Sequence, residues 1–158
     1  MRSHKLVLAL ALTAGLAVPA AVPAASPADA TTRASTCRVE VNFVDAYDTD
    51  ENNGDEIRIN LAGYMYPSGN RYVAMNNGDR AYSGNFANPT TTIGTTGSAL
   101  FSLREVTPPA VGQGDVLGSV TAWGFTCATL ATGQVIDIPQ HIFGNGYWYY
   151  MGLVMTGL

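Results

Sequence analysis

The chain has 158 residues, of which 47% are hydrophobic, 9% aromatic and 13% charged, and its formal net charge is −4 at pH 7. This length and composition predict one globular domain. The basic residues form no patch, which disfavours nucleic acid as a partner.

Residues 1–30 have the features of a secretory signal peptide. Arg2, His4 and Lys5 form a basic segment, residues 6–18 are apolar, and Ala28-Asp29-Ala30 supplies a small-x-small cleavage site. The apolar stretch is too short to span a bilayer, so we expect a secreted, extracellular protein with no transmembrane segment in the mature chain. Cleavage removes two of the basic residues and one acidic residue, which leaves a net charge of −5.

The mature chain is expected to begin with a polar leader, residues 31–36, followed by a single domain over residues 37–158. Its two cysteines are Cys37 and Cys127. Export makes a disulfide between them the default expectation, and two buried free thiols are the alternative.

The predicted first strand covers residues 37–44. Apolar residues alternate with polar ones and should face inward: Cys37, Val39, Val41 and Phe43.

The segment that follows, residues 45–56, is strongly acidic. It holds six carboxylates and no Lys or Arg, and such a group repels itself unless water, salt or a bound cation screens the charge. Oxygen ligands at alternate positions suit Ca²⁺, which takes six to eight of them. An EF-hand is excluded, because Asn53 stands where that loop needs Gly and Ile59 where it needs Glu. A solvated acidic turn that binds nothing specific remains the alternative.

The rest of the chain also has a period of two rather than 3.6, and Gly and Pro interrupt it every few residues. The Asn77-Gly78 dipeptide predicts a hairpin turn over residues 76–79. The last strand has large side chains on both faces, which predicts a central position. The expected strands after the first cover residues 56–66, 71–75, part of 82–93, 99–106, 116–127, 134–138 and 147–155.

If these eight strands alternate in direction, the loops cluster. The acidic loop, the turn at residues 76–79 and the long loop at residues 107–115 then lie at one end of the domain. Cys37 begins an upward strand and Cys127 ends a downward one, so both cysteines lie at the opposite end. The sequence therefore predicts an all-β, antiparallel β-sandwich with its loops clustered at one end and one disulfide.

Short motifs in this layout resemble those of C2 domains. An apolar strand leads into an aspartate at Phe43-Val44-Asp45, and another leads into Glu105. After a loop, Asp115 is followed by Val116, Leu117 and Gly118. The chain also resembles small secreted actinobacterial proteins of this build, most of which have no defined activity.

The C2 resemblance implies a Ca²⁺ site between two loops. The polybasic strands that some C2 domains use for lipid headgroups are missing, which disfavours docking to a membrane. The carboxylates that the resemblance implies as Ca²⁺ ligands are Asp45, Asp48, Asp50, Asp55, Glu105 and Asp115.

A secreted hydrolase is one alternative function. His141 follows Asp137 by four residues, and Glu105 with Asp115 is a candidate acid–base pair. The sequence has no Gly-x-Ser-x-Gly motif, and its cysteines are expected to be bonded. We therefore expect no catalytic residues and a non-enzymatic binding module that interacts with an extracellular protein or glycan.

The aromatic residues support another alternative, a protein similar to carbohydrate-binding modules. Core packing is the competing interpretation. Within residues 147–150, neighbouring side chains point in opposite directions, so some of them must face away from the core. The aromatic residues concerned are Tyr64, Tyr66, Tyr72, Tyr82, Trp123, Tyr147, Trp148, Tyr149 and Tyr150.

Overall fold

The computed structural model describes residues 32–109 and 112–158. The predicted signal peptide lies outside the described residues. Thr31–Leu158 forms one compact unit.

The described residues form ten strands rather than about eight, together with two single turns of helix. In chain order the elements are β1 (Thr36–Asp48), β2 (Asp55–Leu61), β3 (Tyr64–Tyr66), β4 (Val73–Met75), β5 (Arg80–Tyr82), η1 (Ser83–Phe86), β6 (Thr90–Gly94), β7 (Ser98–Glu105), β8 (Asp115–Trp123), α1 (Gly124–Cys127), β9 (Val135–Phe143) and β10 (Trp148–Gly157).

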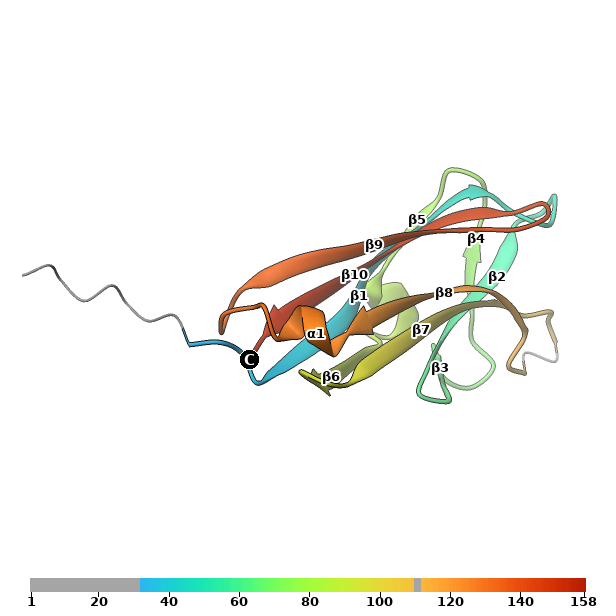
Figure 1. Ribbon diagram of the computed structural model, residues 1–158. Helices are drawn as coiled ribbons and strands as arrows, with labels where there is room; N and C mark the ends of the chain where they lie inside the picture. The colour runs from blue at the N-terminus through green and yellow to red at the C-terminus, as the bar shows by residue number, and fades with distance from the viewer. Residues whose placement is uncertain (1–31, 110–111) are drawn as a thin grey trace, which may run out of the picture. The chain divides into compact units, whose positions relative to one another are not determined.

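The strands form two antiparallel sheets that lie as two layers (Figure 1). The first sheet has the order β5-β1-β10-β9, and β6 also pairs with β1. The second has the order β3-β2-β7-β8, and β4 also pairs with β2. The predicted antiparallel β-sandwich is confirmed, and so is the central position of the last strand, because β10 lies between β1 and β9.

Alternate residues of the long strands fill the space between the sheets. Ile57, Ile59 and Leu61 of β2 are buried there, in the same core cluster as Met151 and Leu153 of β10. Burying each such side chain contributes about 1.5–3 kcal/mol. The period of two expected for this part of the chain is therefore present in β2.

The prediction that Phe43 faces inward is wrong. A bulge in β1 between Val41 and Phe43 shifts the register against β10. The extra residue moves the next side chains to the other face. Val44 and Ala46 are therefore buried in the core, whereas Phe43 is only half-buried and lies on the outer face.

The predicted strand over residues 56–66 is a hairpin of β2 and β3. Leu61 pairs with Tyr64, so Ala62 and Gly63 alone make the turn. Both have positive φ angles, 52° and 87°. A turn of this geometry favours Asn-Gly, and an alanine with positive φ is uncommon, so the sequence has no clear signal for it.

The turn at Asn77-Gly78 is present, but it does not close a hairpin. The strand before it, β4, pairs with β2, whereas the strand after it, β5, pairs with β1. The turn therefore carries the chain from one sheet to the other. The predicted sixth strand is also shorter than expected, because β8 ends at Trp123 and α1 follows.

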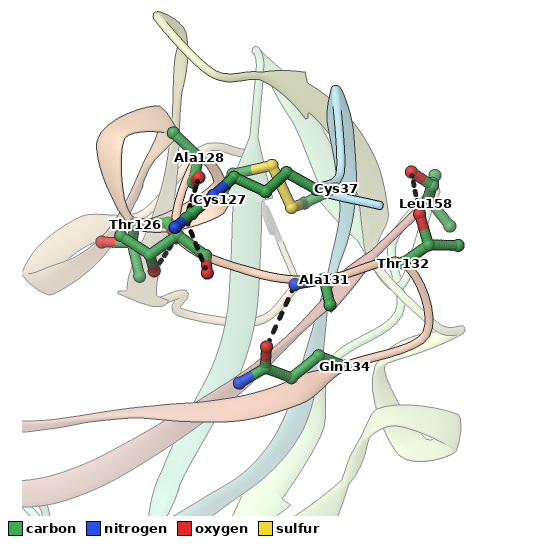
Figure 2. The surroundings of a disulfide bond; sticks show 10 residues. Cys37, Thr126, Cys127, Ala128, Ala131, Thr132, Gln134 and Leu158 are labelled. Carbon is green, nitrogen blue, oxygen red and sulfur yellow. Dashed lines mark hydrogen bonds between the residues drawn. A yellow bond between two sulfur atoms is a disulfide. The ribbon is translucent and has the colours of Figure 1, made fainter. Parts of the chain in front are cut away.

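The disulfide lies at the end of the sandwich opposite the acidic loop, as predicted. Cys37 is the second residue of β1 in the first sheet, and Cys127 ends α1, which follows β8 of the second sheet. Figure 2 shows the bond beside the segment from Ala131 to Gln134, where the amide of Ala131 donates a hydrogen bond to Gln134 Oε1 at 3.0 Å. The disulfide thus joins the two sheets at this end.

Within residues 32–109 and 112–158, no helix has the length and the apolar character needed to cross a bilayer.

Removing the disulfide should destabilise the domain strongly. The bridge joins residues separated by 90 positions. A crosslink that closes so long a loop lowers the entropy of the unfolded chain, which stabilises the folded state by about 4 kcal/mol. We expect the double variant Cys37→Ala, Cys127→Ala to lose about that much free energy of unfolding in urea denaturation. Equal stability of the variant and its parent, or a free thiol in unreduced peptide maps of the parent, would contradict the assignment.

Candidate functional site

Four connections between described strands emerge at the same end of the sandwich. Their described residues are 49–54, 76–79, 106–109 with 112–114, and 144–147, and they share this end because the strands around them are antiparallel. Figure 1 shows the β9–β10 turn near the β1–β2 connection. We call the carboxylates gathered here the acidic end: Asp48, Asp50, Glu51, Asp55, Glu105 and Asp115.

Asp55 organises the acidic end from within. Its side chain is fully buried at the start of β2. Its Oδ2 accepts a hydrogen bond from the backbone N–H of Asp50 at 3.2 Å, and its Oδ1 accepts one from the N–H of Glu51 at 3.1 Å. These bonds fold the connection back onto the first residue of β2. A carboxylate that accepts such bonds compensates for its burial.

Tyr149 supplies the third partner of Asp55. Its hydroxyl donates to Asp55 Oδ2 at 2.5 Å, and the whole residue is buried. Burial and this hydrogen bond raise the pKa of Tyr149 above its ordinary value, so its hydroxyl keeps its proton and remains the donor. Tyr149 lies on β10 and Asp55 on β2, so the bond crosses between the two sheets.

Glu105 and Asp115 lie directly opposite each other on β7 and β8. The pKa of Glu105 is raised to about 7, first by burial and then by the negative charges of Asp55, Glu51, Asp50 and Asp115. Negative charge on the β1–β2 connection thus disfavours the charged form of Glu105. The charges of Glu105 and of these four carboxylates therefore influence one another.

Two further features hold the β7–β8 connection in place. Arg58, which is buried, donates hydrogen bonds to the carbonyl oxygens of Gly112 at 3.0 Å and Pro67 at 2.7 Å. Gly114 has a φ of 63° and packs against the backbone carbonyl of Glu105, where a β-carbon would collide. The connection can therefore return directly beside Glu105.

A polar hollow lies between the β1–β2 and β4–β5 connections. Its volume is about 290 Å³, and its lining includes Asp48, Glu51 and Asn76. Asn77 bridges the two connections, because its amide donates to Asp48 Oδ1 at 3.3 Å and its Oδ1 accepts from Thr49 Oγ1 at 2.9 Å. The roles of Asn76 and Asn77 were missed from the sequence, although the predicted turn placed them at the correct end.

Asp45 lies apart from the acidic end. The bulge in β1 turns it to the outer face, where its two carboxylate oxygens accept hydrogen bonds from Arg80 at 2.5 and 2.6 Å. Among the residues implied as ligands, Asp45 is thus engaged by a guanidinium group on the neighbouring strand β5. The pairing with Arg80 had no local signal in the sequence, because the two residues are 35 positions apart.

The side chains of the acidic end do not converge on a single point. Among the residues that the structure describes, no group of three or more His, Cys, Asp or Glu side chains is arranged to hold a metal ion. The structure therefore places Asp48, Asp50, Asp55, Glu105 and Asp115 at one end of the sandwich without forming a closed coordination shell.

The first pair considered for hydrolysis, Asp137 and His141, lies on β9. Asp137 is opposite Val154 and His141 is opposite Tyr150, so the two are four positions apart on one strand. That separation is about 13 Å along a β-strand. The imidazole of His141 instead accepts a hydrogen bond at Nδ1 from Trp148 Nε1, at 3.1 Å.

Comparisons with solved structures give a similarity of fold. The chain is similar to a C2 domain of plant extended synaptotagmin 1, with a TM-score of 0.47 and 9% sequence identity, over 80% of this chain and 97% of that domain. No protein-family model matches the sequence. No curated protein matches it either.

Loss of the Tyr149 hydroxyl should cost more than loss of an ordinary tyrosine hydroxyl. We expect Tyr149→Phe to lower the free energy of unfolding by about 1.5–3 kcal/mol, because the lost hydrogen bond goes to a charged group. Tyr147→Phe is the matched control, since the Tyr147 hydroxyl donates to the neutral carbonyl of Leu117 at 2.7 Å. That control should lose about 1 kcal/mol in the same urea titration. Equal losses would mean that Asp55 is not specially dependent on Tyr149.

The raised pKa of Glu105 predicts a pH dependence of stability in metal-free protein. Glu105 keeps its proton up to about pH 7 in the folded state. In the unfolded chain it loses the proton near its ordinary pKa of about 4.3. Between these values the folded state binds more protons, so this residue makes the free energy of unfolding fall as the pH rises.

Glu105→Gln should remove that contribution. We expect the variant to gain stability relative to the parent as the pH rises from about 5 to about 8, measured by urea denaturation in chelator. Glu40→Gln is the control, because Glu40 pairs with Arg38 on β1 outside the acidic end. A parent–variant difference that stays constant across this pH range would show that Glu105 titrates normally.

Proposed function

We propose that this protein is a secreted, non-enzymatic binding module whose acidic end takes up Ca²⁺. The single observation that carries the Ca²⁺ site is the gathering of carboxylates on the β1–β2 and β7–β8 connections at one end of the sandwich. Glu105 is charged only at the cost of repulsion from Asp50, Glu51, Asp55 and Asp115, and its pKa is raised to about 7 by burial together with that repulsion. A divalent cation converts this repulsion into attraction.

The donor atoms suit a hard cation. The hollow beside the β1–β2 connection is lined by carboxylate, amide and hydroxyl side chains, including Asp48, Thr49 and Asn77. Ca²⁺ binds such oxygen ligands in flexible geometries. The ligands we propose are Asp48, Asp50, Glu105 and Asp115, which lie on or beside the β1–β2 and β7–β8 connections.

Asp55 takes a different role in this proposal. Because its oxygens already accept three hydrogen bonds, it fixes the shape of the β1–β2 connection and contributes negative charge from beneath. Asp45 is left out of the ligand set, because Arg80 neutralises it on the outer face.

The remaining parts of the proposal have separate support. The disulfide between Cys37 and Cys127 fits an oxidising, extracellular compartment, in agreement with the signal peptide that the sequence predicts. The absence of catalysis is supported by His141, whose ring is hydrogen-bonded to Trp148 rather than to a hydroxyl nucleophile.

A screen with esterase, glycosidase and nuclease substrates should give background rates. Turnover that disappears in His141→Ala would refute the non-enzymatic part.

Ca²⁺ should raise the melting temperature of the protein. An ion that binds only the folded state stabilises it by about 2.7 kcal/mol at a hundredfold excess over its dissociation constant. For a domain of this size the melting temperature rises by several degrees. We expect this rise in calorimetry at constant ionic strength, and we expect the double variant Asp50→Asn, Asp115→Asn to abolish it.

Without Ca²⁺ the double variant should be at least as stable as the parent, because it has lost repulsive charge. Asp137→Asn is the matched control, since Asp137 is exposed on β9 and outside the acidic end, and this variant should keep the full response. Equal melting temperatures of the parent in excess chelator and in millimolar Ca²⁺ would refute the Ca²⁺ site. The acidic loop would then be a solvated turn that binds no specific ion.

A further inference from the structure

The outer face of the first sheet carries a continuous row of aromatic side chains. Neighbouring ring centroids are 4.7 Å apart for Tyr47 and Trp148, 5.9 Å for Trp148 and His141, 4.5 Å for His141 and Tyr150, and 5.7 Å for Tyr150 and Phe43. We call this surface the aromatic face and define it as Phe43, Tyr47, His141, Phe143, Trp148 and Tyr150.

The strand register explains why these rings meet. Tyr150 lies between Asp45 on β1 and His141 on β9, and Trp148 is opposite Phe143 on β9. Phe43 reaches the same surface because of the bulge in β1. It lies over Gly152, where a β-carbon would come within 2.8 Å of the Phe43 ring. Gly152 thus leaves the room in which Phe43 packs onto the sheet.

These side chains are too exposed to be explained by core packing. Tyr47 is 47% exposed, Trp148 46% and Phe143 74%. His141, Phe143 and Trp148 line a shallow apolar hollow of about 260 Å³. Single exposed hydrophobic residues are normal on protein surfaces, whereas a contiguous group of them marks a site of interaction.

The charges on this surface are balanced. Arg80 lies over the Phe43 ring, 4.4 Å from its centroid, and both oxygens of Asp45 accept hydrogen bonds from the same guanidinium. One end of the surface borders the acidic end, because Asp48 is opposite Trp148. The acidic end would repel an anionic partner, and the paired Asp45 and Arg80 offer no net charge to hold a cationic one, so the surface itself favours an uncharged partner.

Polar groups accompany the rings. The His141 imidazole accepts the indole N–H of Trp148 at Nδ1, so in its neutral form His141 carries its proton on Nε2. The Asp45–Arg80 pair supplies charged hydrogen-bonding atoms beside Phe43. Apolar flat surfaces with a few fixed polar groups are the usual composition of a ligand site.

We infer that the aromatic face is a docking surface for an uncharged glycan chain. Pyranose rings present flat C–H faces that stack on aromatic rings, and their hydroxyl groups reach the polar atoms at the edge. Adjacent rings of the row are inclined by 37–43° to one another, so the surface fits a twisted, soluble chain better than a flat crystalline one. The inference rests on the proposed role as a binding module but not on the proposed Ca²⁺ site.

Affinity electrophoresis in native gels that contain chelator tests the inference. The gels would hold soluble xylan, glucomannan, mixed-linkage β-glucan or hydroxyethyl cellulose, with polygalacturonate as the anionic comparison. We expect at least one uncharged polysaccharide to retard the protein and polygalacturonate not to. Phe143→Ala and Trp148→Ala should each weaken this binding by about tenfold or more, which corresponds to about 1.4 kcal/mol.

Phe125→Ala is the matched control. Phe125 is 67% exposed and stacks on Trp123 at the disulfide end of the sandwich, far from the aromatic face along the strands. It should leave glycan binding unchanged. Phe143→Ala keeps the test decisive if Trp148→Ala fails to fold, because the more exposed Phe143 side chain can be removed with little loss of packing.

Several outcomes would overturn the inference. They are retardation by none of the uncharged polysaccharides, equal weakening by Phe125→Ala, retardation by polygalacturonate alone, and binding to phosphatidylserine vesicles in place of glycan. Self-association in sedimentation velocity that Phe143→Ala abolishes would instead assign this surface to a second copy of the chain. Glycan binding in chelator together with no Ca²⁺-dependent rise in melting temperature would uphold this inference and refute the Ca²⁺ site alone.

Discussion

The hydrogen bond between Asp55 and Tyr149 is the constraint on which the loop end of this sandwich depends. A fully buried carboxylate is stable only if its oxygens are satisfied, and here two loop amides and one hydroxyl from the opposite sheet satisfy them. The same bond joins β2 to β10, while the disulfide joins the two sheets at the other end. The sandwich is therefore linked across its core at both ends, and its acidic residues are held close together against their mutual repulsion.

Much of this arrangement follows from local patterns in the sequence. The alternation of Ile57, Ile59 and Leu61 places β2, and large residues on both faces identify β10 as central. The directions of the expected strands were predicted correctly, although two further strands were missed. The missed hairpin at Ala62-Gly63 adds an upward strand, β3, before the upward β4, and β5 and β6 both run downward where one strand was expected. Neither change alters the direction of the strands that follow.

What the sequence did not reveal depends on contacts between distant residues. A bulge in β1 turns Phe43 and Asp45 outward, and it is visible only in the register against β10. Asp45 consequently binds Arg80 instead of joining the other carboxylates. Asp55 looked like any other acid of its loop, because the hydroxyl of Tyr149 that holds it lies 94 positions away. Charge density alone thus located the acidic end but did not separate the buried organising carboxylate from the exposed ones.

Amide hydrogen exchange at Asp50 and Glu51 in metal-free protein tests most directly whether Asp55 organises the acidic end. Both amides donate to the Asp55 carboxylate, so they should exchange only when the connection opens, far more slowly than in an unstructured peptide. They should lose much of this protection in Tyr149→Phe, while residues of β1 near the disulfide keep theirs. Exchange of the two amides at the rate of an unstructured peptide in the parent protein would contradict the central role given to Asp55.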